Sequence, residues 1–214
     1  MIKNVVFDLD GTMLDTSEGI IRSVRYTVEQ LGYEEIDYDS LLTFVGPPVQ
    51  NSFKKHFGCN DEEAQKAANV FRDYYKKEAL LLAKPYDGIY ELCEQLKSKG
   101  IKMAVATYKR EDYALKLLNH FGFDKYCNPM HGADNNNLLK KEDIIRMCLE
   151  EMDAAQEETV LIGDTDNDAK GALKAGINFI AVTYGFGFKS ESDLMDFPHT
   201  GVADNPIDVL KYLR

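Results

Sequence analysis

The chain has 214 residues and a formal net charge of −11 at pH 7. Nucleic acids and anionic membrane surfaces are bound through basic patches, so this charge argues against both kinds of partner. The length exceeds the roughly 100–200 residues of a typical domain and suits one core domain with an inserted piece. An acidic protein that handles an anionic substrate needs a cation or lysines at its site.

The first predicted element is a short strand that ends in two carboxylates. Residues 5–7 are apolar and are followed by Asp8-Leu9-Asp10-Gly11-Thr12. A strand that is apolar on both faces usually belongs to a buried parallel sheet, and ligands bind beyond the carboxyl ends of such strands. Residues two apart in an extended chain point to the same side, so Asp8 and Asp10 can address one substrate or metal. The alternative is a strand end with ordinary polar turn residues.

Helical signals dominate the next part of the chain, and residues 37–83 offer no convincing strand. Apolar residues recur at helical spacing, which predicts helices over 20–31, 49–57 and 61–82. Gly32 ends the first of these helices, and Asn60 or Asp61 is suited to cap the last one.

Strands and helices alternate from residue 86 onward. The predicted helices are 89–96, 112–121 and 142–152, and the predicted strands are 101–106, 159–162 and 178–183. This alternation implies an α/β core domain with a mostly parallel, doubly wound sheet. We expect the core domain to comprise residues 1–15 and 85–214, with an all-helical cap domain inserted at 16–84. The run Asn135-Asn136-Asn137 is predicted to be a loop.

A second acidic cluster, Gly163-Asp164-Thr165-Asp166-Asn167-Asp168, follows one of the predicted strands. A calcium-binding loop is excluded, because it needs Gly at its sixth position and Glu at its twelfth, where this chain has Ala169 and Ala175. Magnesium typically takes one or two carboxylates together with substrate phosphate, which two acidic turns above neighbouring strands would supply. The alternative is the general preference of acidic residues for a helix N-terminus. It could explain Asp166 and Asp168, but it does not account for Asp164.

Two further sites could balance the charge of an anionic substrate. Thr107 ends a predicted strand and offers a hydroxyl to a phosphate oxygen, although threonine is common in strands. Lys140 and Lys141 open the helix that begins near Glu142, where a positive charge is unfavourable. A lysine at this position either serves a site or points to solvent.

The remaining signals concern the compartment. The four cysteines, Cys59, Cys93, Cys127 and Cys148, lack zinc-type spacing, and we expect buried free thiols, above all at the two that lie in apolar helical patterns. We find no charged-then-apolar leader and no apolar stretch near the ~20 residues that span a bilayer. These features predict a cytoplasmic protein without a membrane partner.

Taken together, four motifs in this order resemble those of the haloacid-dehalogenase-like (HAD) phosphohydrolases. They are Asp8-Leu9-Asp10-Gly11-Thr12, Thr107, Lys141 and Gly163-Asp164-x-x-x-Asp168. The resemblance covers essentially the whole chain and implies a Rossmann-like HAD core with a small helical cap. The sequences Phe44-Val45-Gly46-Pro47-Pro48 and Val182-Thr183-Tyr184-Gly185-Phe186-Gly187 are most similar to the phosphoglycolate-phosphatase-type branch.

The resemblance implies a role for each motif residue. Asp8 would be the nucleophile that forms an aspartyl-phosphate, and Asp10 would act as general acid and then as general base. The implied Mg²⁺ ligands are Asp8, the backbone carbonyl of Asp10, and Asp164, with Asp168 in support. Thr107 and Lys141 would offset charge on the transferring phosphoryl group. The candidate substrate contacts are Gly46, Pro47, Gln50, Thr107 and Tyr108.

We therefore predict a Mg²⁺-dependent phosphatase whose partner is a small phosphorylated metabolite: a phosphoglycolate-like ester, a nucleotide or a sugar phosphate. A phosphomutase similar to β-phosphoglucomutase is the alternative, although Thr12 stands where those relatives often carry Val. A dehalogenase is disfavoured, because that branch lacks an acid equivalent to Asp10. A non-catalytic phosphometabolite-binding protein is a third alternative, which the presence of Asp8 and Asp10 disfavours.

The lysine motif departs from the Lys-Pro of many relatives. Here the chain reads Lys140-Lys141-Glu142-Asp143, so either lysine is a candidate. We choose Lys141, because it directly precedes the acidic pair, as the lysine does in branches that lack proline. The sequence predicts no particular oligomeric state.

Overall fold

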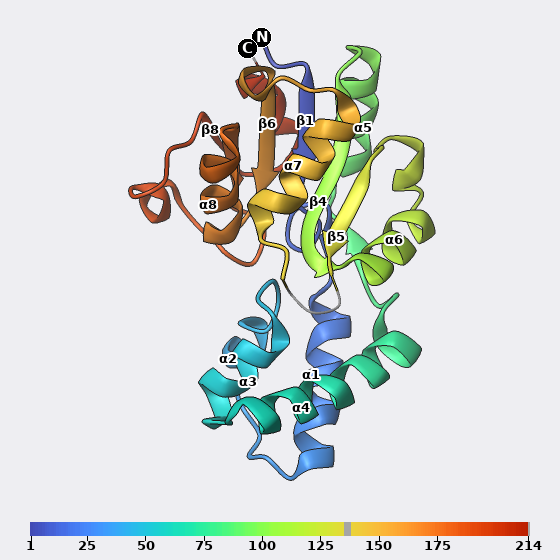
Figure 1. Cartoon of the computed structure of the whole chain (residues 1–214), viewed down its shortest axis with the longest axis vertical. Coiled ribbons are helices and arrows are strands. Elements are labelled where there is room, and N and C mark those ends of the chain that lie inside the picture. Colours follow the sequence, from blue (N-terminus) through green and yellow to red (C-terminus); the bar gives the residue numbers. More distant parts are fainter. Residues whose placement is uncertain (135–137, 214) are drawn as a thin grey trace. The chain divides into compact units, whose positions relative to one another are not determined.

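The computed structural model describes residues 1–134 and 138–213, so the loop predicted at 135–137 lies outside the described residues. The chain divides into two compact units, shown in Figure 1. The first unit comprises Met1–Asp15 and Pro85–Arg214, and the second comprises Thr16–Lys84. Within the described residues, no helix is both long and apolar enough to cross a membrane.

A parallel sheet forms the centre of the first unit. Its six strands, counted over the described part of the chain, lie in the order β5-β4-β1-β6-β7-β8, and every pair of neighbours is parallel. The strands are β1 (Asn4–Phe7), β4 (Lys102–Arg110), β5 (Met130–Ala133), β6 (Thr159–Gly163), β7 (Asn178–Val182) and β8 (Gly201–Ala203). In the centre of the sheet Phe7 lies opposite Ile162, so the chain leaves β1 and β6 at the same edge.

Helices connect these strands and cover the sheet. The α-helices are α5 (Ile89–Ser98), α6 (Glu111–His120), α7 (Lys141–Met152) and α8 (Asp166–Ala175). Short 3₁₀ segments are η2 (Phe123–Lys125), η3 (Gln156–Glu158), η4 (Glu191–Leu194) and η5 (Pro206–Tyr212). Helices α7 and α8 pack against each other, and in Figure 1 α7 lies in front of the sheet with α5 behind it.

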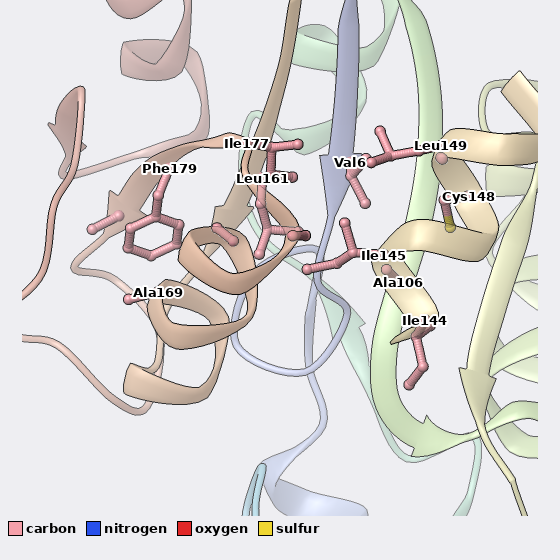
Figure 2. Close-up of a cluster of buried hydrophobic side chains, with 14 of the residues drawn as sticks. Val6, Ala106, Ile144, Ile145, Cys148, Leu149, Leu161, Ala169, Ile177 and Phe179 are labelled. Atoms are coloured by element: carbon pink, nitrogen blue, oxygen red, sulfur yellow. The ribbon is translucent and has the colours of Figure 1, made fainter. Parts of the chain in front are cut away.

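A buried apolar cluster fixes α7 on the sheet. Ile145 and Leu149 of this helix point toward Val6 of β1 in Figure 2, and Leu161 of β6 belongs to the same cluster. All four side chains are buried, and burying a large aliphatic side chain contributes roughly 1.5–3 kcal/mol. Because the helix begins at Lys141, this packing also fixes the position of its first residue beside the sheet edge.

The second unit is helical. It contains α1 (Ser17–Leu31), α2 (Tyr38–Leu42), α3 (Val49–Phe57), α4 (Asp61–Tyr74) and the π-helix η1 (Tyr75–Ala79). Gly32 ends α1 in the left-handed conformation that glycine adopts without strain, at φ 69°. Asn60 caps α4, because its side chain accepts from the backbone N–H groups of Glu62 and Glu63. Two-residue strands, β2 (Leu14–Asp15) and β3 (Lys84–Pro85), pair where the chain passes between the units.

The predicted fold class, an α/β fold with a doubly wound parallel sheet, is confirmed. Three predicted details are wrong. The strand predicted to end near Thr107 continues to Arg110, because Arg110 still pairs with Ala133 across a shift in register. Strands β5 and β8 were not predicted, and the last helix of the second unit changes from α to π at Tyr75.

Candidate active site

Three carboxylates gather where β1 and β6 end. Asp8 follows β1 directly, and its backbone N–H donates to the carbonyl of Ile162 at 2.9 Å. Asp164 follows β6, and Asp168 lies in the first turn of α8. One oxygen from each of Asp8, Asp164 and Asp168 lies within 4.8 Å of the others, and all three residues are buried. Two parallel strands and one helix N-terminus thus bring separated parts of the sequence to one point.

Lys141 is the cation of this group. Its Nζ lies 2.6 Å from Oδ1 of Asp8 and 2.7 Å from Oδ1 of Asp168, and the residue is 1% exposed. The backbone N–H of Lys141 donates to the Tyr108 hydroxyl at 2.9 Å, which satisfies one of the free N–H groups at the start of α7. Lys140, the other predicted candidate, is exposed. The structure therefore brings Lys141 and not Lys140 to the carboxylates.

The loop after β7 orients Asp164. Its Oδ2 accepts from the backbone N–H groups of Phe186 at 2.7 Å and Gly187 at 3.1 Å. A Cβ on Gly185 would lie closer than 3.0 Å to both the Asp164 carboxylate and the backbone, so the chain can approach only with glycine there. The other oxygen, Oδ1, is buried and has no hydrogen-bond partner among the residues that the structure describes. One carboxylate oxygen is thus fixed and the other is left for a ligand.

Asp168 is held by its own helix start. Its Oδ2 accepts from the backbone N–H of Thr165 at 3.0 Å and from the Thr165 hydroxyl at 2.6 Å. This is the capping-box arrangement of α8. The remaining oxygen, Oδ1, faces Lys141. Asp168 therefore contacts Lys141 directly, and its support of a metal stays a prediction.

Asp10 lies apart from the group of three carboxylates, and a second lysine binds it. Lys109 Nζ lies 2.9 Å from Oδ1 and 3.0 Å from Oδ2 of Asp10, and the two side chains are only 7% and 8% exposed. Lys109 is not among the site residues predicted from the sequence. The available signal was its spacing, since a lysine two residues after Thr107 points to the same side of an extended strand. The predicted strand ends at Thr107, so this spacing did not place Lys109 on the strand.

The other predicted contacts lie in two places. Thr107 is buried, and its Oγ1 accepts from the backbone N–H of Lys109 at 3.1 Å. Gly46 and Pro47 precede α3 in the second unit. Gln50 lies within α3, where its Nε2 donates to Gln65 at 3.5 Å. The binding roles of these residues stay predictions.

Burial shapes the electrostatics of the site. Burial raises the pKa of Asp8 above its ordinary value, with Lys141 opposing the shift and Asp168 adding to it. Burial also raises the pKa of Asp164, and the charge of Asp168 acts in the same direction. Burial alone would lower the pKa of Lys141, but Asp168 and Asp8 raise it overall. The ionised carboxylates of this site therefore need more positive charge than Lys141 supplies.

The residues fit a small divalent cation. Three buried carboxylates offer the oxygen ligands that hard cations prefer. One of their oxygens, Oδ1 of Asp164, is buried and receives no hydrogen bond from the described part of the chain. Buried polar atoms of this kind are normally paired, so a ligand at this point would account for it.

A family model described as "Haloacid dehalogenase-like hydrolase" matches residues 5–182. The chain belongs to this family. This HAD-like hydrolase is 36% identical to a protein named 5'-nucleotidase from Pseudomonas aeruginosa, over 88% of this chain and 86% of that protein. It is 31% identical to the tyrosine-protein kinase PtkA of Mycobacterium tuberculosis, over 92% of this chain and 67% of that protein.

Further matches cover nearly the full length of the HAD-like hydrolase. A phosphoglycolate phosphatase from Aquifex aeolicus is 29% identical over 98% of this chain and 95% of that protein. The crystal structure of a predicted phosphatase from Clostridium acetobutylicum superposes with a TM-score of 0.90 at 35% identity, covering 99% of this chain and 98% of that one. The predicted family is confirmed. The predicted enzyme class, a phosphoric monoester hydrolase, agrees with the names of three of these four matches.

Proposed function

We propose that this HAD-like hydrolase is a Mg²⁺-dependent phosphatase that hydrolyses a small phosphomonoester through an aspartyl-phosphate on Asp8. One observation carries the proposal: Asp8, Asp164 and Asp168 converge within 4.8 Å, and Lys141 contacts two of them. A carboxylate nucleophile splits one difficult displacement at phosphorus into two easier ones.

In the first step an oxygen of Asp8 attacks phosphorus, and the bond from phosphorus to the ester oxygen breaks. Asp10 gives its proton to the leaving alkoxide. In the second step water attacks the same phosphorus, its proton passes to Asp10, and the bond to Asp8 breaks. The products are an alcohol and inorganic phosphate, and Asp8 returns to its starting form. Lys141 and Thr107 would offset the charge of the phosphoryl oxygens during both steps.

Mg²⁺ would be held by Asp8, the backbone carbonyl of Asp10, and Asp164, with Asp168 in support. A bound Mg²⁺ neutralises charge on a transferring phosphoryl group. The raised carboxylate pKa values support this assignment, because a divalent cation stabilises the ionised form that nucleophilic attack by Asp8 requires.

The candidates for selecting the ester are Gly46, Pro47, Gln50 and Tyr108. Loops that close over a substrate commonly select the leaving group and exclude water. Gln50 carries a buried amide oxygen that has no hydrogen-bond partner within the described residues, which supports a polar contact there.

Four free, buried cysteines support the expected cytoplasmic location, where thiols stay reduced.

The test is phosphate release from phosphoglycolate, a nucleoside 5'-monophosphate and a sugar phosphate, each with Mg²⁺ or with EDTA. The wild type is compared with Asp8→Asn and with Asp166→Asn. Asp166 is the control, because its exposed carboxylate at the start of α8 pairs with the exposed Lys170. We expect Mg²⁺-dependent release by the wild type and Asp166→Asn. For Asp8→Asn we expect a loss of at least about 10⁴-fold, as for other covalent nucleophiles.

Three results would contradict the proposal. Transfer that appears only when a sugar bisphosphate is added would indicate a phosphomutase. Transfer of label from ATP to a protein tyrosine, without ester hydrolysis, would indicate the activity that the name of PtkA states. Binding of a phosphorylated metabolite without any turnover would indicate a non-catalytic protein.

A further inference from the structure

Lys109 forms a nearly buried ion pair with Asp10, and this pair is separate from the contacts of Lys141. Both carboxylate oxygens of Asp10 accept from the Lys109 ammonium, at 2.9 and 3.0 Å. Two hydrogen bonds from one donor group fix both the position and the rotation of a carboxylate. Lys141, in contrast, contacts Asp8 and Asp168. The two lysines therefore bind different carboxylates: Lys141 binds Asp8 and Asp168, and Lys109 binds Asp10.

The backbone around Lys109 is held from two sides. Its N–H donates to the Thr107 hydroxyl, in the part of β4 where the register with β5 shifts. On the neighbouring strand, a Cβ on Gly132 would lie closer than 3.0 Å to the carbonyl oxygen of Lys109. An irregularity of this kind re-aims a side chain, and such features often occur beside active sites. The local structure thus directs the ammonium of Lys109 at Asp10.

A purely structural role explains these features poorly. Bringing a lysine and an aspartate out of water costs more than packing apolar residues of similar volume, so a nearly buried pair is weak evidence for stability. Asp10 follows Asp8, a member of the group of three carboxylates, by two residues in the sequence. The buried pair is explained if the reaction requires the Asp10 carboxylate to be held in a fixed position.

We propose that Lys109 is a positioning residue that holds the Asp10 carboxylate for the second half of the reaction, the hydrolysis of the aspartyl-phosphate. In this step the oxygen of water forms a bond to phosphorus, the bond from phosphorus to Asp8 breaks, and the water proton goes to Asp10. Asp10 enters the step as the carboxylate that Lys109 binds. This inference rests on the proposed function, since it requires the aspartyl-phosphate.

The experiment separates the two halves of the reaction with p-nitrophenyl phosphate, labelled at phosphorus. Its leaving group departs without a proton, so formation of the phosphoenzyme does not depend on Asp10. Rapid acid quenching measures the label on the protein, and the nitrophenol burst measures formation. For Lys109→Met we expect decay of the phosphoenzyme to slow on the order of 10²-fold, as for a displaced catalytic group. The burst should change far less, so label should accumulate.

Matched variants distinguish positioning from a general loss of structure. Lys170→Met removes an exposed lysine that pairs with Asp166 and should leave both phases unchanged. Lys109→Arg keeps the charge and should recover part of the decay rate. Adding Lys109→Met to Asp10→Asn should slow the decay no further, because coupled residues are not additive. Gly132→Ala keeps the lysine side chain but displaces the backbone of Lys109, so it should also slow decay of the phosphoenzyme. This variant takes the place of Lys109→Met if the Lys109→Met protein does not fold.

Decay of the phosphoenzyme at the wild-type rate in Lys109→Met, or equal slowing in the Asp10→Asn background, would overturn the inference. A burst that falls as much as the decay would do the same, because it would indicate a structural role. Absence of an Asp8-dependent phosphoenzyme in the wild type would instead refute the proposed function itself and the inference with it. The wild-type measurement therefore tells the two failures apart.

Discussion

The two units of this protein treat charge in opposite ways. The first unit buries Asp8, Asp10, Asp164, Asp168 and Lys141 at one edge of its sheet. In the second unit the buried polar residues are all uncharged, and two of them, Ser23 and Thr27, donate to helix carbonyls one turn earlier. Burying charge is costly unless the groups serve each other or a ligand. The difference favours the first unit as the place of the chemical steps. It predicts that substitutions of its buried charged residues change those steps, whereas substitutions that disturb the helices of the second unit change stability alone.

The largest effect is expected at Lys141. Lys141→Met should lower turnover by about 10²- to 10⁴-fold, since it removes positive charge beside both Asp8 and Asp168. It should also lower the free energy of unfolding by roughly 3–5 kcal/mol, because buried carboxylates lose their partner. Phosphate release and urea unfolding measure the two effects. Lys174→Met, which breaks an exposed pair with Glu142, is the control and should cost at most about 1 kcal/mol. Equal effects of the two substitutions would contradict the expectation that the buried charges, and not the exposed ones, matter to the reaction.

Two glycines offer a sharper version of the same contrast. Gly185→Ala would force a Cβ against the Asp164 carboxylate, whereas Gly19→Ala would force one against the carbonyl of Ala79 inside the second unit. Both substitutions should destabilise the fold. Only Gly185→Ala should weaken Mg²⁺ binding, by roughly 10- to 100-fold, as expected when a group that orients a metal ligand is displaced. A Mg²⁺ titration followed by thermal shift measures this. A similar loss of Mg²⁺ affinity in Gly19→Ala would show that weaker Mg²⁺ binding follows from any loss of stability and not from displacement of Asp164.

Part of this site could be predicted from the sequence, and part could not. The carboxylates and Lys141 lie in runs whose spacing carries the signal, since each follows a buried apolar strand or begins a helix. Gly32 and Asn60 likewise end and cap helices by local preference. The extension of β4 depends on pairing with β5, whose sequence, Met130–Ala133, contains little that favours a strand. Lys109 was missed for this reason: its position is decided by a neighbour far along the chain.

Both the stability of the fold and the stabilisation that Mg²⁺ adds should depend on pH. Burial raises the pKa of Asp164 to about 7 and that of Asp8 to about 8, from an ordinary 3.8. Because the folded protein then binds protons that the unfolded chain has released, these groups stabilise the fold at low pH, and that contribution is lost as pH rises from about 4 to 8. Mg²⁺ binds the ionised forms, so its stabilising effect should grow over the same range.

Thermal unfolding at pH 5.5 and pH 8, with and without Mg²⁺, measures this dependence. The increase in Tm caused by Mg²⁺ should be larger at pH 8. Asp164→Asn should remove most of the increase at both pH values, while Asp166→Asn, which changes an exposed acid, should keep it. An increase that is independent of pH would mean that Mg²⁺ stabilises the fold elsewhere.

The smallest effect is expected at the start of α4, in the second unit. Asn60→Ala removes a side chain that accepts from two backbone N–H groups, at 2.9 and 3.0 Å, and should lower the free energy of unfolding by about 1 kcal/mol. Asn60→Asp keeps an accepting oxygen and should cost less. Neither substitution should change the decay rate of the phosphoenzyme, since that step uses side chains of the first unit alone. A slower decay in Asn60→Ala, with the fold intact, would show that the second unit takes part in the chemical step. The inference that the buried charged residues of the first unit carry out this step alone would then be wrong.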